Sequence, residues 1–139
     1  MSKVAVVFWS ATGNTETMAN CIAEGAGAAA TIVPCAEITP AKLNEFDVVA
    51  FGCPAMGAEQ LEESEFEPMF SDLEGSLNGK KIALFGSYGW GDGQWMRDWA
   101  ERTKKAGAVL AADPLIVNLS PDADGKAKCR ELGKALADA

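Results

Sequence analysis

Apolar and polar residues fall into blocks along the chain that predict a regular succession of strands and helices. Three short runs, at residues 4–9, 47–53 and 80–86, are apolar for most of their length. Continuous apolar runs of this kind are typical of strands that are buried on both faces. A fourth run, at 30–35, ends with proline and predicts a strand near an edge. A fifth, at 109–117, predicts one strand that Asp113 and Pro114 interrupt.

Between these runs, apolar residues recur at intervals of three and four, which is the spacing of one helix face. Ser64 followed by Glu67 predicts a capping box at the start of one helix. Ser120 followed by Pro121 predicts the N-cap of the last helix. The predicted helices cover residues 16–25, 39–46, 64–77, 94–106 and 120–138.

Strands that alternate with helices of this length predict an α/β fold. Right-handed crossovers place helices on both faces of a parallel sheet, so the expected architecture is a three-layer, doubly wound, five-stranded parallel sheet. The length of 139 residues suits a single domain over residues 1–139. In such a sheet, ligands bind beyond the carboxyl ends of the strands, where the strand order reverses.

Composition and charge narrow the functional classes. The chain is 48% apolar and 23% charged, and no apolar run is long enough to span a membrane. Its net charge of −8 disfavours nucleic acid and anionic lipid as partners and favours basic protein surfaces. The first strand begins too early for a signal peptide, so we expect a cytoplasmic protein. Scattered cysteines and the absence of histidine predict no metal site.

The turn that follows the first strand has the composition of an anion-binding loop. A strand, a polar loop and a helix together aim backbone N–H groups at a ligand, assisted by the positive end of the helix. No Lys or Arg occurs between residues 4 and 41, so neutral dipoles must hold any phosphate there, which suits a buried monophosphate better than ATP with Mg²⁺. The alternative is an ordinary strand-to-helix turn with hydroxyl caps. The candidate residues are Ser10, Ala11, Thr12, Gly13, Asn14 and Thr15.

Two further loops, at residues 54–63 and 87–93, follow the third and fourth predicted strands. Met56 offers a soft thioether, and Gly57 after it can adopt backbone conformations closed to other residues. Trp90 lies between two glycines outside any predicted element and is placed to stack on a planar ligand. Its alternative role is that of an apolar plug over the end of the sheet. Parallel strands bring all three loops to one edge, so we expect a single site.

These three segments resemble the flavin-binding segments of short-chain flavodoxins of the clostridial and Megasphaera type. The matching sequences are Trp-Ser-Ala-Thr-Gly-Asn-Thr from residue 9, Gly-Cys-Pro-Ala-Met-Gly from residue 52 and Phe-Gly-Ser-Tyr-Gly-Trp-Gly from residue 85. The resemblance covers essentially the whole chain. It implies FMN as the cofactor and the strand order 2-1-3-4-5, neither of which the residues alone supply.

The resemblance also implies a role for each segment. The first loop wraps the phosphate, Met56 and Trp90 cover the two faces of the flavin ring, and Glu59 accepts from the ring N3–H. The Gly57 carbonyl accepts from N5 of the semiquinone after a peptide flip. Ala11 and Ala58 depart from the common family residues, and Ala58 bears on how readily the peptide flips. The remaining implied cofactor-binding residues are Pro54, Ala55, Ser87, Tyr88, Gly89 and Gly91.

The implied function is low-potential one-electron transfer by a monomeric carrier that is not an enzyme. Non-covalently bound FMN cycles between neutral semiquinone and anionic hydroquinone and shuttles electrons between redox enzymes. Residues 53–79 contain seven acidic side chains and no basic one, and such a field disfavours the anionic hydroquinone. The same charge steers the chain to basic patches on reductases and acceptor enzymes in transient complexes.

Two other functions stay open at this point. A small FMN-dependent reductase of the same fold, acting on quinones or nitro compounds, would need an open substrate cleft. A receiver-like signalling module would need clustered acidic residues after the first strand, where Phe8, Trp9 and Ser10 stand instead.

Overall fold

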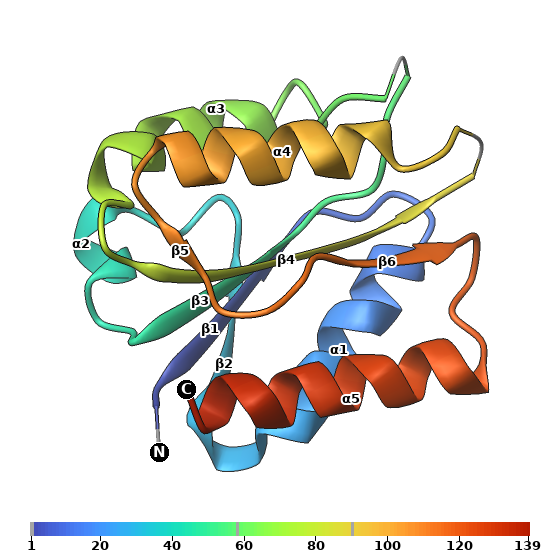
Figure 1. Ribbon diagram of the computed structural model, residues 1–139, viewed down its shortest axis with the longest axis horizontal. Helices are drawn as coiled ribbons and strands as arrows, with labels where there is room; N and C mark the ends of the chain where they lie inside the picture. Colours follow the sequence, from blue (N-terminus) through green and yellow to red (C-terminus); the bar gives the residue numbers. More distant parts are fainter. Residues whose placement is uncertain (1, 58, 90) are drawn as a thin grey trace.

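One parallel sheet, whose strands differ in length, forms the centre of the molecule (Figure 1). The computed structural model describes residues 2–57, 59–89 and 91–139. The strands are paired in the order β2-β1-β3-β4-β5, and β6 also pairs with β4. The expected order 2-1-3-4-5 is therefore confirmed, with the predicted last strand divided into β5 and β6. The strands are β1 (Val4–Phe8), β2 (Ala30–Pro34), β3 (Val48–Gly52), β4 (Lys81–Tyr88), β5 (Val109–Leu110) and β6 (Leu115–Asn118).

Helices cover both faces of this sheet. In Figure 1, α3 and α4 lie along one face, whereas α1 and α5 lie along the other. The three-layer architecture is thus as predicted. Within the described ranges, no helix is both long and apolar enough to cross a bilayer. The helices are α1 (Asn14–Ala26), α2 (Pro40–Leu43), α3 (Phe66–Leu73), α4 (Gln94–Lys105) and α5 (Ala123–Ala137), with short 3₁₀ turns η1 (Gly27–Ala29) and η2 (Glu74–Ser76).

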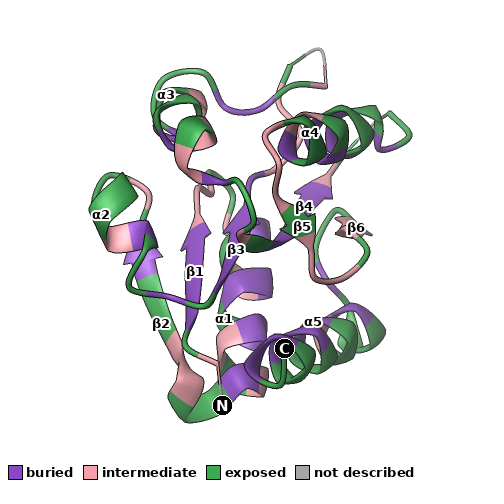
Figure 2. Cartoon of the chain, turned by 60° about the vertical axis from the view of Figure 1, so that its left-hand side comes forward, coloured by how far each residue is buried: buried purple, intermediate pink, exposed green. Residues whose placement is uncertain are grey.

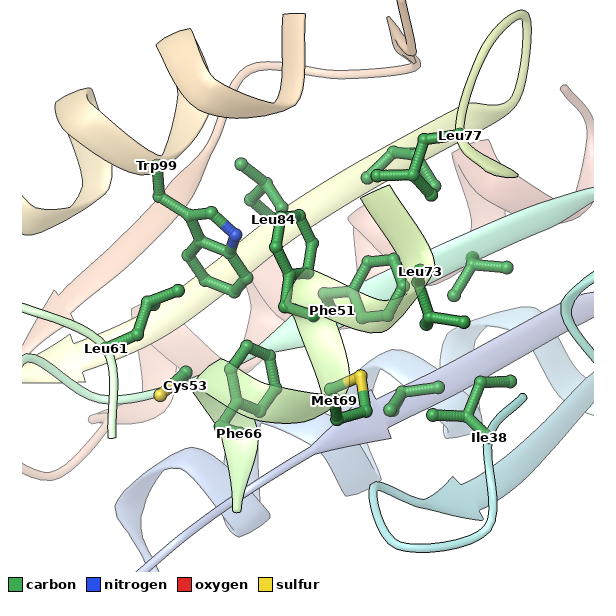
Figure 3. Close-up of a cluster of buried hydrophobic side chains, with 14 of the residues drawn as sticks. Ile38, Phe51, Cys53, Leu61, Phe66, Met69, Leu73, Leu77, Leu84 and Trp99 are labelled. Carbon is green, nitrogen blue, oxygen red and sulfur yellow. The ribbon is translucent and has the colours of Figure 1, made fainter. Parts of the chain in front are cut away.

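The central strands are buried on both faces, as their apolar runs predicted (Figure 2). Successive residues of β3 point alternately to two cores, because side chains alternate across a strand. Val49 and Phe51 join the core under α3 and α4, whereas Val48 and Ala50 join the core under α1 and α5. Figure 3 shows the first core, in which Phe51 belongs to an aromatic cluster with Phe66, Phe70 and Trp99.

The start of α3 differs from the predicted capping box. The helix begins at Phe66, and the carboxylate of Glu62 accepts hydrogen bonds from the N–H groups of Ser64, Glu65 and Phe66 at 2.8, 2.7 and 2.9 Å. The Ser64 hydroxyl donates to the same carboxylate. The predicted pairing of Ser64 with Glu67 is therefore wrong, because a buried carboxylate four residues upstream occupies the N–H groups that Ser64 would have capped.

The last helix also starts later than predicted. Asp122 is the N-cap of α5, and its side chain accepts from the Gly125 N–H at 2.8 Å. Ser120 and Pro121 lie outside the helix, so the predicted N-cap at Ser120 is wrong. An aspartate at this position accepts from one of the free N–H groups of the first turn, and its negative charge interacts favourably with the positive end of the helix dipole.

Glu62 should make stability depend on pH below the neutral range. Burial raises its pKa, but the hydrogen bonds that it accepts outweigh this effect and lower the pKa to about 2. Its folded pKa lies below the ordinary value of 4.5, so its contribution is complete above that value and is lost as the pH falls towards 2. Chemical denaturation from pH 5 to 2 should show a loss of roughly 3 kcal/mol that Glu62→Gln lacks. A wild-type-minus-variant difference that stays constant over this range would contradict the assignment.

Glycines allow α1 and α5 to pack closely. A Cβ added at Gly133 would lie 1.9 Å from the Ile22 carbonyl oxygen of α1, and one added at Gly25 would lie 1.9 Å from the Arg130 carbonyl oxygen of α5. Backbone atoms cannot yield as the end of a side chain can, so the two helices would have to separate.

The variant Gly133→Ala should therefore destabilise the protein by about 1–3 kcal/mol, because the methyl group forces α5 away from α1. Thermal unfolding followed by circular dichroism measures the loss. Gly75→Ala is the matched control, since a Cβ at Gly75 would meet no atom within 4 Å. Equal melting temperatures for the two variants would show that the helices do not depend on this close contact.

Candidate functional site

The carboxyl ends of β1, β3 and β4 lie side by side and bring the three predicted loops together. Phe8 is level with Gly52, and Gly52 with Phe85. Beyond these ends, the Ala55 N–H donates to the Ser87 carbonyl at 3.0 Å. The Thr15 and Ser87 hydroxyls are 3.2 Å apart in a buried hydrogen bond. The first and second loops are therefore each tied directly to the end of β4.

A cavity of about 210 Å³ opens between these loops. Nine of the seventeen predicted cofactor-binding residues line it, and they come from all three segments. The lining consists of Ala11, Thr12, Asn14, Pro54, Ala55, Met56, Ser87, Tyr88, Gly89 and one residue that was not predicted, Leu119.

The first loop presents its backbone N–H groups in an open turn before α1. The Ser10 hydroxyl accepts from the N–H groups of Gly13 and Glu16 at 3.1 and 3.3 Å. Gly13 has a φ of 96°, a left-handed conformation in which glycine is favoured. Within the part of the chain that the structure describes, the N–H groups of Ala11, Thr12, Asn14 and Thr15 have no intramolecular acceptor.

These donors fit a small, buried anion. These four N–H groups belong to the residues at the positive end of α1, and Thr12 and Asn14 line the same cavity. No Lys or Arg occurs from residue 4 to residue 41, so the anion must be held by neutral dipoles. A phosphate monoester is an anion of this size and hydrogen-bonding capacity, and the loop therefore fits the phosphate of a mononucleotide.

The second loop is a tight turn whose two sides are joined by backbone hydrogen bonds. Met56 and Gln60 exchange two of them, at 2.9 and 3.0 Å, and the Cys53 sulfur accepts from the Glu62 N–H at 3.4 Å. Gly57 stands exposed at the tip with a φ of 49°. Met56 faces the cavity, as expected of a residue that covers a ligand.

Glu59 does not line this cavity. Its carboxylate reaches towards α4 and accepts from the Gln94 N–H at 3.1 Å. It borders a neighbouring hollow of about 340 Å³ that Trp95 and Trp99 also line. Its role as the acceptor for a flavin N–H stays a prediction.

The third loop is shorter than predicted because β4 continues through Ser87 and Tyr88. Tyr88 packs on Trp95 with ring centroids 5.6 Å apart, and the Trp95 indole N–H donates to the Cys53 carbonyl at 3.1 Å. Strand pairing with β6 extends this part of β4, which the sequence around the glycines did not indicate. The predicted roles of Ala58 and Trp90 lie outside the described residues.

Two residues that follow or end β6 were missed by the sequence analysis. The Leu119 N–H donates to the Tyr88 carbonyl at 2.7 Å, and the Asn118 side chain donates to the carbonyls of Tyr88 and Gly89 at 3.2 and 3.4 Å. Leu119 has a φ of 57° and is 57% exposed at the cavity. Both residues follow the fifth predicted strand, at 109–117. Because loops at the carboxyl ends of parallel strands lie together, the same reasoning that grouped the first three loops also predicts these two residues at the site.

The acidic segment after β3 is partly neutralised. Arg102 of α4 pairs with Glu67 and Glu74 at 2.6 and 2.7 Å, and these hydrogen bonds raise the pKa of the guanidinium. The carboxylate of Glu65 accepts from the Trp9 indole N–H at 2.9 Å. The described residues contain no cluster of His, Cys, Asp and Glu able to hold a metal ion.

Comparisons with known proteins point to one family. The family model described as "Flavodoxin" matches residues 6–133. A flavodoxin of Clostridium beijerinckii is 46% identical over 136 residues, covering 96% of this chain and 98% of that protein. A flavodoxin of Megasphaera elsdenii is 47% identical over 139 residues, covering 98% of this chain and 99% of that protein.

A solved structure supports the same family. The solution structure of the two-electron reduced flavodoxin of M. elsdenii superposes with a TM-score of 0.89 and covers 98% of this chain and 99% of that one. These relatives do not favour the alternative of a small FMN-dependent reductase. Flavodoxins bind FMN and transfer electrons, and the fit of the open loop before α1 to a phosphate agrees with that cofactor. The chain belongs to the flavodoxin family, as a short-chain member whose cofactor is FMN.

Proposed function

We propose that this chain is a single-domain, low-potential one-electron carrier that shuttles electrons between redox enzymes and is not itself an enzyme. Bound FMN supplies the redox chemistry, cycling between neutral semiquinone and anionic hydroquinone. The observation that carries the proposal is the meeting of three loops around one cavity, with an uncharged anion-binding turn on one side.

The residues of the first loop bind the phosphate. The N–H groups of Ala11, Thr12, Asn14 and Thr15 donate to its oxygens, and the Thr12 hydroxyl adds a side-chain donor. Ser10 shapes the turn, because its hydroxyl oxygen accepts from the N–H groups of Gly13 and Glu16. Its O–H stays available to donate to the phosphate. The charge of the phosphate is thus retained in the site, where it opposes the arrival of a second negative charge on the flavin.

The second and third loops position the flavin ring. Met56 covers one face from its place at the cavity. The resemblance to flavodoxins assigns the other face to Trp90. The Gly57 peptide lies at the exposed tip of a loop whose base is fixed by the exchange between Met56 and Gln60. A carbonyl at this tip can turn towards the ring without disturbing β3, since the hydrogen bonds that fix the loop lie below it.

Charge sets both the potential and the partners. Arg102 offsets part of the field of Glu67 and Glu74, so the carboxylates of Glu59, Glu62 and Glu65 carry more of the effect on the flavin. A net charge of −8 steers the monomer to basic surfaces on reductases and acceptor enzymes in the cytoplasm. Complexes formed in this way are transient and weaken as salt is added.

Phosphate recognition can be separated from ring recognition by comparing FMN with riboflavin. Apoprotein titrated by fluorescence quenching should bind FMN at least about 100-fold more tightly, because several charge-assisted hydrogen bonds to the phosphate are absent with riboflavin. Thr12→Ala should weaken FMN binding and leave riboflavin binding unchanged. Equal affinities for the two flavins in the wild type would remove the assigned role of residues 10–15.

The carrier function is tested by a spectroscopic redox titration. Partial reduction should give the blue neutral semiquinone, and Gly57→Thr should lower its maximum yield, because a β-branched residue resists the positive φ at this tip. Fast steady-state NADH oxidation by the protein alone, with no semiquinone at any potential, would indicate an enzyme instead.

A further inference from the structure

Glu59 connects the two loops that flank the ring site. Its backbone has a φ of 53°, a left-handed conformation that is uncommon for a residue with a side chain. From this position its carboxylate crosses to the third loop and accepts from the Gln94 N–H, the first residue of α4, at 3.1 Å. A negative charge at the amino end of a helix is favourable, so the contact stabilises both the unusual backbone and the start of α4.

Gly91 provides the space that this contact needs. A Cβ added there would lie 2.6 Å from Glu59 Oε1 and 2.7 Å from its carboxyl carbon. A side chain at position 91 would therefore require the carboxylate to shift from the position in which its Oε1 accepts from Gln94. Gly91 also has a φ of 90°, so the conformation of the loop and the passage of the carboxylate both require glycine.

The far side of the third loop is anchored separately. Arg97 of α4 donates to the backbone carbonyl of Asp92 at 3.0 Å and to its carboxylate at 2.9 Å. Arg97 of α4 thus binds Asp92, and the Glu59 carboxylate of the second loop lies beside Gly91. The third loop is therefore contacted on one side by α4 and on the other by the second loop. Among the residues described here, the Glu59 contact is the side-chain hydrogen bond that joins the second loop to the start of α4.

We propose that Glu59 acts as a latch between the two loops: its carboxylate joins residues 54–61 to the start of α4 by accepting from Gln94. Gly91 leaves the space that the carboxylate occupies. The second and third loops are thereby held in a fixed relative position around the flavin ring. The inference rests on the proposed function, because it assigns these loops to the ring of FMN. One carboxylate oxygen accepts from Gln94, and the other has no hydrogen-bond donor among residues 2–57, 59–89 and 91–139, so it can accept from a donor on the ligand. Gly91 is thus a positioning residue that acts through Glu59.

A double-mutant cycle on FMN affinity tests the latch. Gly91→Ala and Glu59→Ala should each raise the Kd of the full-length apoprotein for FMN about tenfold, the scale of one hydrogen bond to a charged group. Gly91→Ala should raise the Kd much less in the Glu59→Ala background than in the wild type, because the added Cβ no longer meets a carboxylate and only the cost of the positive φ remains. Glu59→Gln should restore most of the affinity, since its amide oxygen can still accept from Gln94.

A control variant separates backbone strain from the latch. Gly79→Ala imposes a comparable strain at a φ of 77°, but no atom lies within 4 Å of its added Cβ and Gly79 is in a turn that does not border the site. It should lower the melting temperature and leave the Kd for FMN unchanged in both the wild-type and Glu59→Ala backgrounds.

Amide hydrogen exchange gives a readout that does not need FMN or the Gly91 variant. The Gln94 N–H should exchange faster in Glu59→Ala than in the wild type, and Glu59→Gln should restore its protection. Additive effects of Gly91→Ala and Glu59→Ala, or unchanged exchange at Gln94, would overturn the latch and leave the carrier function intact. Failure of the wild type to bind FMN would instead refute the proposed function itself.

Discussion

The parallel register of β1, β3 and β4 is the constraint on which the rest of the molecule depends. These strands are buried on both faces, so a shift by one residue would exchange the side chains of the two cores. The register places Phe8, Gly52 and Phe85 on one line across the sheet. β1 and β3 end at this line, whereas β4 continues to Tyr88. The loops after β1 and β3 therefore lie beside the last residues of β4. The packing of the core thereby fixes the geometry of the site.

Small residues at the strand ends let the loops approach one another. A Cβ at Gly86 would lie 2.2 Å from the Cys53 carbonyl oxygen, and that same oxygen accepts from the Trp95 indole. The end of β3 is thus in contact with both β4 and α4. Ser87, the next residue of β4, accepts a hydrogen bond from the Ala55 N–H through its carbonyl and shares a hydrogen bond with Thr15 through its hydroxyl. A short segment of β4 therefore links the first loop to the second loop and to α4, which follows the third loop.

The distribution of charge shows how tertiary contacts change the meaning of an acidic segment. Glu62, Glu67 and Glu74 belong to the same run of acidic residues, yet they have two different environments. Glu62 is buried at the start of α3 as a helix cap, whereas Glu67 and Glu74 are paired with Arg102, which comes from α4. A field computed by counting carboxylates along the chain would overstate the charge that acts on a ligand.

The sequence by itself determined the succession of elements, the burial of the central strands on both faces and the three loops that form the site. Each of these follows from local patterns: continuous apolar runs, helical spacing, and glycine or hydroxyl residues at the strand ends. Resemblance to a family supplied the strand order and the cofactor. Only the tertiary structure decided that Glu62 caps α3, that Asn118 and Leu119 reach the end of β4, and that Glu59 turns to α4. The reason is physical: each of these contacts joins a polar group to a partner on another element. A local pattern carries no information about which N–H or carbonyl the folded chain will bring within reach.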